Sequence, residues 1–138
     1  MRFTPVKNSW KDLKFVRVWA FIGYLLVFFT VYICLSPNPP DTSSVQFGDK
    51  IVHMGGYLCL FLWFAQIYKR KYHYLPVVGL TLLGIFIECA QGMTEYRSFE
   101  LLDMLANTSG VLFGWIIAST SIANVLMKVE LLLTPRSI

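Results

Sequence analysis

Charged residues are scarce in this chain. Lys, Arg, Asp and Glu make up 14% of its 138 residues, against roughly 25% in an ordinary soluble domain. A soluble domain this small exposes much of its surface and needs polar side chains to cover it. A chain that is 56% hydrophobic therefore does not fit that class. Disorder is also excluded, because 16% of the residues are aromatic and disordered chains are poor in aromatics. The remaining class is an integral membrane protein.

Cysteine is equally scarce. The three cysteines, Cys34, Cys59 and Cys89, are widely spaced and each lies within an apolar run. An odd number at such spacing forms neither a disulfide framework nor a zinc knuckle. We expect all three to be small buried apolar residues.

Four apolar segments are long enough to cross a bilayer, which takes roughly 17 to 25 residues. Ser98 is a suitable N-cap for the last segment, and the prolines that follow Leu35 end the first. The sequence predicts an all-α integral membrane four-helix bundle, a single domain over residues 1–138. The expected spans cover residues 15–35, 48–68, 75–92 and 98–122.

Basic residues predict the orientation of these spans. On one side lie ten of them: Arg2, Lys7, Lys11, Lys14, Arg17, Lys69, Arg70, Lys71, Lys128 and Arg136. The other side has only Lys50 and Arg97. Since positive charge is retained in the cytoplasm, both termini should be cytoplasmic, with residues 36–48 and 93–97 outside. The net charge of +4 thus reflects membrane orientation, and no nucleic-acid partner is expected.

Polar residues within the second, third and fourth spans each occupy one helix face at 3.6 residues per turn. Ionisable side chains cost about 2.5–3.5 kcal/mol at the centre of a span, so these faces should point toward one another. All lie in the outer half of the membrane, which predicts one polar pocket open to the outer leaflet, with little contribution from the first span. The residues concerned are Asp49, Lys50, His53 and Tyr57, then Glu88 and Gln91, then Asp103 and Asn107.

Several roles are open to these residues. His53, Glu88 and Asp103 form a set suited to general acid–base catalysis. The expected ligand-binding residues are Asp49, Lys50, Tyr57, Gln91, Arg97 and Asn107. Interhelical hydrogen bonding is the structural alternative for the amides. A divalent cation is a further alternative, but the paired histidines of a zinc hydrolase are absent and two cations would repel the ion. No metal or other cofactor is therefore predicted.

The order and spacing of these residues resemble the VanZ-like family over about residues 45–118. The resemblance implies a multi-pass helical protein of the bacterial inner or plasma membrane. The founding member of the family is linked to low-level resistance to the glycopeptide teicoplanin, and the resemblance implies no particular reaction. Glu95 and Tyr96 depart from the family pattern. The matching motif is Gly48-Asp49-Lys50-x-x-His53-x-x-x-Tyr57, Glu88-x-x-Gln91, and Arg97-Ser98 followed by Asp103, Asn107, Gly110 and Gly114.

Two cations placed against the usual charge bias indicate an anionic ligand. Arginine can bind phosphate oxygens through two parallel hydrogen bonds. The sequence therefore predicts binding or processing of a phosphate-bearing lipid or cell-wall precursor, with a link to glycopeptide resistance implied by the family. The pocket could belong to a small lipid phosphohydrolase, to a head-group transferase or to a non-enzymatic binding protein. The alternative is a transport or assembly subunit whose polar face contacts an unknown protein partner.

The predicted orientation can be tested by cysteine labelling of intact cells, in a background without the native cysteines. A cysteine at Asn38 should react with an impermeant thiol reagent, whereas one at His73 should not. The reverse pattern would invert the topology and move the pocket to the inner leaflet.

Overall fold

The computed structural model describes residues 12–38, 47–119 and 124–133, which form helices and contain no strand. Within these ranges four segments are long and apolar enough to cross a membrane, and the all-α membrane architecture is confirmed. The elements are α1 (Val16–Cys34), α2 (Gly48–Ile67), the short 3₁₀ helix η2 (Arg70–Tyr72), α3 (Tyr74–Gln91), α4 (Leu101–Ala118) and α5 (Val125–Leu133).

The fourth span differs from the expected residues 98–122. Helix α4 begins at Leu101, and Glu100 occupies the N-cap position in an extended conformation, so Ser98 does not cap the helix. At the other end the chain turns at Ser119, whose hydroxyl donates to the Ile116 carbonyl. The polar residues after Ala118 end the apolar run earlier than predicted, and α5 is a separate helix that the sequence analysis did not anticipate.

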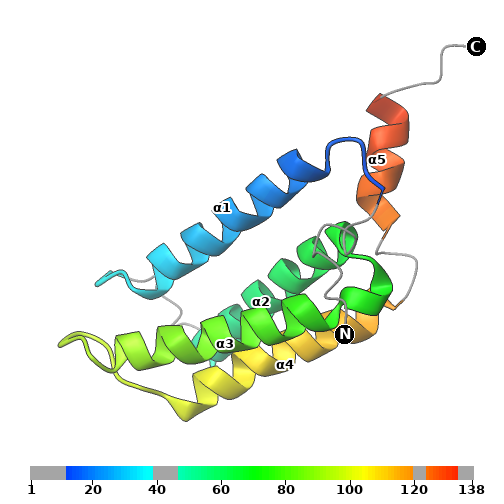
Figure 1. The fold of residues 1–138 in the computed structure, drawn as a ribbon. Coiled ribbons are helices and arrows are strands. Elements are labelled where there is room, and N and C mark those ends of the chain that lie inside the picture. Colours follow the sequence, from blue (N-terminus) through cyan, green and yellow to red (C-terminus); the bar gives the residue numbers. More distant parts are fainter. Residues whose placement is uncertain (1–11, 39–46, 120–123, 134–138) are drawn as a thin grey trace, which may run out of the picture.

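Helices α2, α3 and α4 pack together, and α1 lies alongside them (Figure 1). The most extensive contact joins α2 to α4, and α1 packs chiefly on α2. Phe61, Ala65 and Val111 are completely buried in this core. By contrast, α1 exposes large apolar side chains such as Phe28 and Tyr32. In a bilayer these side chains face lipid, because acyl chains are as apolar as the side chains themselves.

Glycine allows the close approach of α2 and α4. A Cβ atom at Gly110 would stand 2.1 Å from the Met54 carbonyl oxygen, and one at Gly114 would stand 3.0 Å from Phe61 Cβ. Backbone atoms cannot move aside as a flexible side chain can, so the first of these positions admits only glycine. The two positions form a small-xxx-small pattern typical of closely packed membrane helices.

The cysteines do not match the expectation of burial. Cys59 and Cys89 are exposed on the helix surface, Cys34 is half-buried, and all three thiols are free. In a membrane protein the outer surface is itself apolar, so a small apolar residue loses nothing by facing outward. His73 is in turn almost fully buried, which would block labelling on either side of the membrane. Lys71, exposed in η2, is the more informative position for a labelling cysteine on the predicted cytoplasmic side.

Helix α5 is attached to the beginning of α1 through Glu130. Its carboxylate accepts hydrogen bonds from the backbone N–H of Lys14 (2.7 Å) and Phe15 (2.9 Å) and from the Trp19 indole N–H (2.7 Å). The N-cap residue of α1, Phe15, supplies no side-chain cap of its own, so Glu130 satisfies donors that a helix start leaves open. Burial alone would raise the pKa of Glu130, but these three donors outweigh it and hold the pKa below its usual value.

Replacing Gly110 with Ala should separate α2 from α4, because the new methyl group meets the Met54 backbone. Overpacking of this kind costs about 1–3 kcal/mol. Thermal unfolding in detergent should show a clear loss of stability for Gly110→Ala. A matched Gly79→Ala variant, whose Cβ would meet nothing within 4 Å, should be at least as stable as wild type. Equal stability of both variants would contradict the packing described.

The attachment of α5 should weaken in acid. A carboxylate whose pKa is depressed by folding contributes stability above its unfolded pKa of about 4.3, and this contribution is lost as the pH falls through the folded value. Wild type should therefore unfold at a higher temperature than Glu130→Gln at pH 7, and the difference should shrink below about pH 4. A difference that stays constant down to pH 3 would show that the Glu130 charge is unimportant.

Candidate functional site

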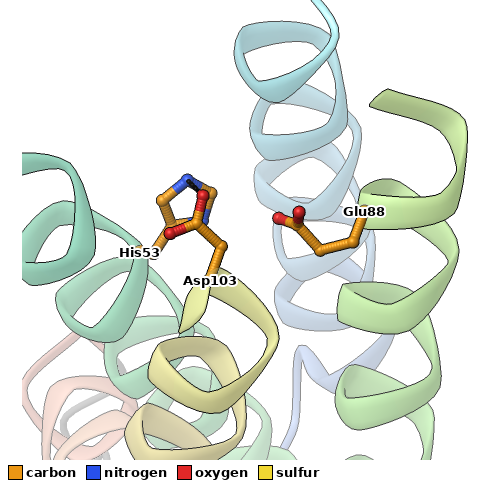
Figure 2. A group of neighbouring side chains, drawn as sticks. All are labelled: His53, Glu88 and Asp103. Atoms are coloured by element: carbon orange, nitrogen blue, oxygen red, sulfur yellow. Dashed lines mark ion pairs between the residues drawn. The ribbon is translucent and has the colours of Figure 1, made fainter. Parts of the chain in front are cut away.

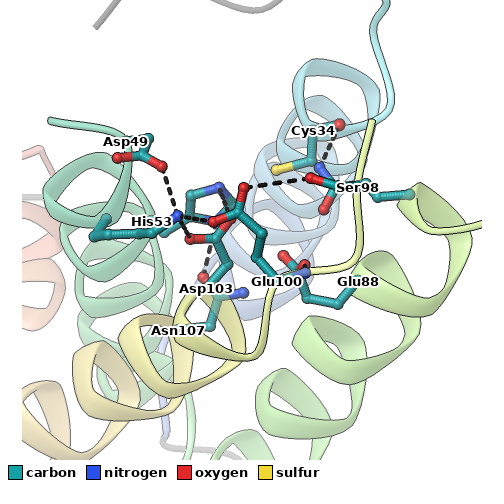
Figure 3. A network of polar contacts seen from close by, with 10 residues as sticks. Cys34, Asp49, His53, Glu88, Ser98, Glu100, Asp103 and Asn107 are labelled. Carbon is teal, nitrogen blue, oxygen red and sulfur yellow. Dashed lines mark hydrogen bonds and ion pairs between the residues drawn. The ribbon is translucent and has the colours of Figure 1, made fainter. Parts of the chain in front are cut away.

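Polar side chains from three helices meet at the end of the bundle where α1 and α3 finish and α2 and α4 begin (Figure 3). We call this the polar end. The faces predicted from helical spacing converge here, and the connection between α3 and α4 closes over them. His53, Glu88 and Asp103 offer ligand atoms that all lie within 4.8 Å of one another.

Lys50 is held by three carboxylates. Its ammonium lies 2.6 Å from Asp49 Oδ2 and 2.6 Å from Asp103 Oδ1, and it also pairs with Glu100 Oε2. Only 16% of the Lys50 side chain is exposed. These ion pairs link the first turn of α2 to the first turn of α4. They also neutralise the Lys50 ammonium, and its predicted role in ligand binding stays a prediction.

His53 is oriented by Asn107. Its Nδ1 lies 3.1 Å from Asn107 Oδ1, and its Nε2 lies 3.7 Å from Asp103 Oδ2. An amide oxygen can only accept, so Nδ1 carries the proton and donates it to Asn107. In a neutral imidazole the lone pair is then on Nε2, which lies 3.7 Å from Asp103 Oδ2. An imidazole held in this tautomer can accept a proton or bind a metal through Nε2.

Glu88 is completely buried on α3. Its Oε2 accepts a hydrogen bond from the Glu100 backbone N–H at 3.3 Å. Its Oε1 has no hydrogen-bond partner in the described part of the chain. Figure 2 shows the carboxylate pointing across the gap toward His53 and Asp103. The site thus contains a buried carboxylate oxygen with unused bonding capacity.

The remaining amide and phenol lie at the same end. Gln91, 1% exposed, donates to the Cys34 carbonyl at 2.7 Å. Tyr57 is equally buried, and its hydroxyl has no hydrogen-bond partner within the described ranges. It lies beside α3, since a Cβ at Gly84 would stand 3.4 Å from it. Gln91 therefore joins helices, whereas Tyr57 retains an unused hydroxyl.

Helix α1 contributes more than expected. Besides Gln91, the Tyr96 hydroxyl donates to α1, reaching the Leu35 carbonyl at 3.0 Å. The last carbonyls of a helix lack donors within the helix, so the end of α1 accepts hydrogen bonds from α3 and from the following connection. The expectation of little contribution from the first span holds for its polar side chains and is wrong for its backbone.

Glu100 is the site residue that the sequence analysis missed. It pairs with Lys50 through its side chain and donates to Glu88 through its backbone. A carboxylate in the first turn of the predicted fourth span, residues 98–122, was the available signal. Ser98 contacts the same side chain, with its hydroxyl 3.4 Å from Glu100 Oε1.

Arg97 differs from Lys50 in its lack of ion-pair partners among the described residues. It is half-buried in the connection between α3 and α4. Within residues 12–38, 47–119 and 124–133 its guanidinium has no ion-pair or hydrogen-bond partner. Its neighbours are fixed on both sides, by Tyr96 on α1 and by Glu100 on Glu88. Arg97 is thus a positioned cation with unused donors.

Acidic side chains outnumber basic ones among the described residues at the polar end. Four carboxylates, those of Asp49, Glu88, Glu100 and Asp103, stand against the single ammonium of Lys50 and the nearby Arg97. Two groups could hold a cation by their donor chemistry: His53, Glu88 and Asp103, or Asp49, Glu100 and Asp103. The first group is the more deeply buried.

An apolar groove of about 250 Å³ lies elsewhere, between α1, α2 and α3. It is lined by residues that include Tyr24, Phe64, Pro76 and Leu80, and by none of the polar residues above. The polar and ionisable side chains described above lie at the polar end and not in this groove.

No curated protein and no solved structure matches this chain. The family model for VanZ/LLP1, in contrast, matches residues 3–126. The match includes all four membrane-spanning helices and every residue of the polar end. The chain belongs to the VanZ/LLP1 family and is a membrane protein with several apolar helices.

Proposed function

We propose that the polar end binds the phosphate-bearing head group of an outer-leaflet lipid or cell-wall precursor, with Arg97 as the main phosphate contact. The observation that supports this is the contrast between two cations. Lys50 has three carboxylate partners, whereas Arg97 has none among the described residues. The excess of basic residues at the opposite end supports placing this end at the outer surface of the membrane.

The connection that carries Arg97 is well suited to presenting a ligand-binding group. Tyr96 holds it to the end of α1, and Glu100 holds it to α3. Fixing the backbone before binding reduces the entropy lost on binding. A guanidinium on such a support can form two parallel hydrogen bonds to one phosphate group.

His53, Glu88 and Asp103 give this site the capacity for acid–base chemistry. The lone pair on His53 Nε2 can accept a proton from water or from a hydroxyl group. Hydrolysis or transfer of the head group could follow binding, with these three residues as the catalytic set. Binding alone would also affect glycopeptide action, since a covered cell-wall precursor is less accessible to the antibiotic.

Arg97→Ala should reduce the retention of phosphate-bearing lipid by purified protein, measured by quantitative lipid mass spectrometry. A hydrogen bond to a charged group is worth about 1.5–3 kcal/mol, so the loss should be about 10- to 150-fold. Arg97→Lys should rescue only in part, because it keeps the charge but lacks the planar two-donor group.

Arg70→Ala provides the matched control, because it removes an exposed arginine from η2 at the opposite end of the bundle. It should retain as much lipid as wild type. Unfolding temperatures should be similar for all variants, since the Arg97 guanidinium has no ion-pair partner among the described residues and even an exposed ion pair contributes only about 0–1 kcal/mol. Full lipid retention by Arg97→Ala would refute the proposal. Loss of folded protein in that variant would instead assign Arg97 a structural role.

A further inference from the structure

Three side chains at the polar end each direct a donor atom toward a common point. We propose that His53, Glu88 and Asp103 together bind one divalent transition-metal ion. Their ligand atoms lie within 4.8 Å of one another. Ligands on one ion at bond lengths of about 2.0–2.2 Å stand at most about 4.4 Å apart. In a tetrahedral set such ligands stand about 3.4 Å apart, so side-chain rotations that shorten the largest separation by about 1.4 Å would close the set around an ion.

The buried Glu88 carboxylate is the strongest indication of an absent partner. Glu88 is 0% exposed, and its Oε1 has no hydrogen-bond partner among the described residues. A buried polar oxygen without a hydrogen-bond partner is unfavourable. In Figure 2 this carboxylate extends away from α3, toward His53 and Asp103. A metal ion between the three groups would use this oxygen.

His53 has the surroundings of a metal ligand. A ligating histidine almost always donates its second ring N–H to an oxygen acceptor, which fixes the tautomer and the ring orientation. Here Nδ1 donates to Asn107 Oδ1 at 3.1 Å, leaving the lone pair on Nε2. Asn107 is 1% exposed, so it is held firmly in place on α4. The hydrogen bond to Asn107 thus fixes the orientation of the ring before an ion binds to Nε2.

Lys50 is compatible with a cation at this point. The sequence argument against a metal was repulsion by the nearby cations. In the structure Lys50 pairs with Asp49 and Glu100 and with one oxygen of Asp103, Oδ1, while Oδ2 faces His53. The carboxylates outnumber the cations, so a divalent ion would reduce the charge imbalance.

The donor set indicates the class of metal. Imidazole favours zinc and other transition metals, whereas carboxylates favour harder ions such as Mn²⁺. One imidazole and two carboxylates suit Zn²⁺ or Mn²⁺. Three protein ligands leave at least one coordination position open. This next step rests on the proposed function. A phosphate oxygen of the ligand that Arg97 contacts would take the open coordination position.

Isothermal titration with Zn²⁺ alone tests the site, using chelator-treated protein in detergent. Wild type should bind one ion per chain. Glu88→Gln and His53→Ala should each weaken binding by at least about 100-fold, and Asn107→Leu by about 10- to 100-fold through loss of orientation. Glu95→Gln, the same change at an exposed position of the neighbouring connection, should bind as wild type does. A Co²⁺-loaded sample should show absorption bands that are absent from His53→Ala.

Glu88→Gln is the decisive variant because it keeps the shape of the side chain and an acceptor for the Glu100 N–H. It should remain folded and lose the increase in unfolding temperature that Zn²⁺ produces in wild type. No Zn²⁺ or Mn²⁺ binding by wild type, or binding unaffected by Glu88→Gln, would overturn the metal site. Arg97-dependent lipid retention would then still stand. Metal binding together with full lipid retention by Arg97→Ala would refute only the lipid proposal.

Discussion

The close approach of α2 and α4 is the constraint on which the polar end depends. The two backbones meet where a Cβ atom at Gly110 would lie 2.1 Å from the Met54 carbonyl oxygen. This contact is about two turns from the first residues of each helix. It brings Lys50 and His53 of α2 against Asp103 and Asn107 of α4. If α2 and α4 were farther apart, these polar groups would lose their present partners, and lipid chains offer no replacement.

The apolar bilayer explains why the polar side chains at the polar end have hydrogen-bond and ion-pair partners on several helices. Within hydrocarbon, polar groups must be satisfied by the protein itself, and here the donors and acceptors come from all four long helices and from the connection that carries Glu100. The same connection positions Arg97, which lacks a protein partner among the described residues. A cluster rich in carboxylates beside a positioned arginine is suited to a ligand that combines phosphate with a metal ion.

Much of this architecture was accessible from the sequence, because helical periodicity alone brought His53, Glu88 and Asp103 to one place. Local patterns could not reveal partnerships across long separations. Glu130 binds the start of α1 from 115 residues away, and nothing near it in sequence marks that role. Likewise, the occupation of Lys50 by three carboxylates depends on the packing of α2 on α4. The orientation in the membrane and the roles of the site residues stay predictions.

A double-mutant cycle on Lys50 and Asp103 tests most directly whether the packing of α2 on α4 creates one coupled site. Lys50→Met, Asp103→Asn and the double variant would be compared with wild type by reversible unfolding in detergent. Residues in direct contact show coupling energies of about 0.5–3 kcal/mol. Because both side chains are largely buried, we predict a value of about 1–3 kcal/mol. Additivity within about 0.5 kcal/mol would contradict the account, since it would show that the two helices do not share their charges.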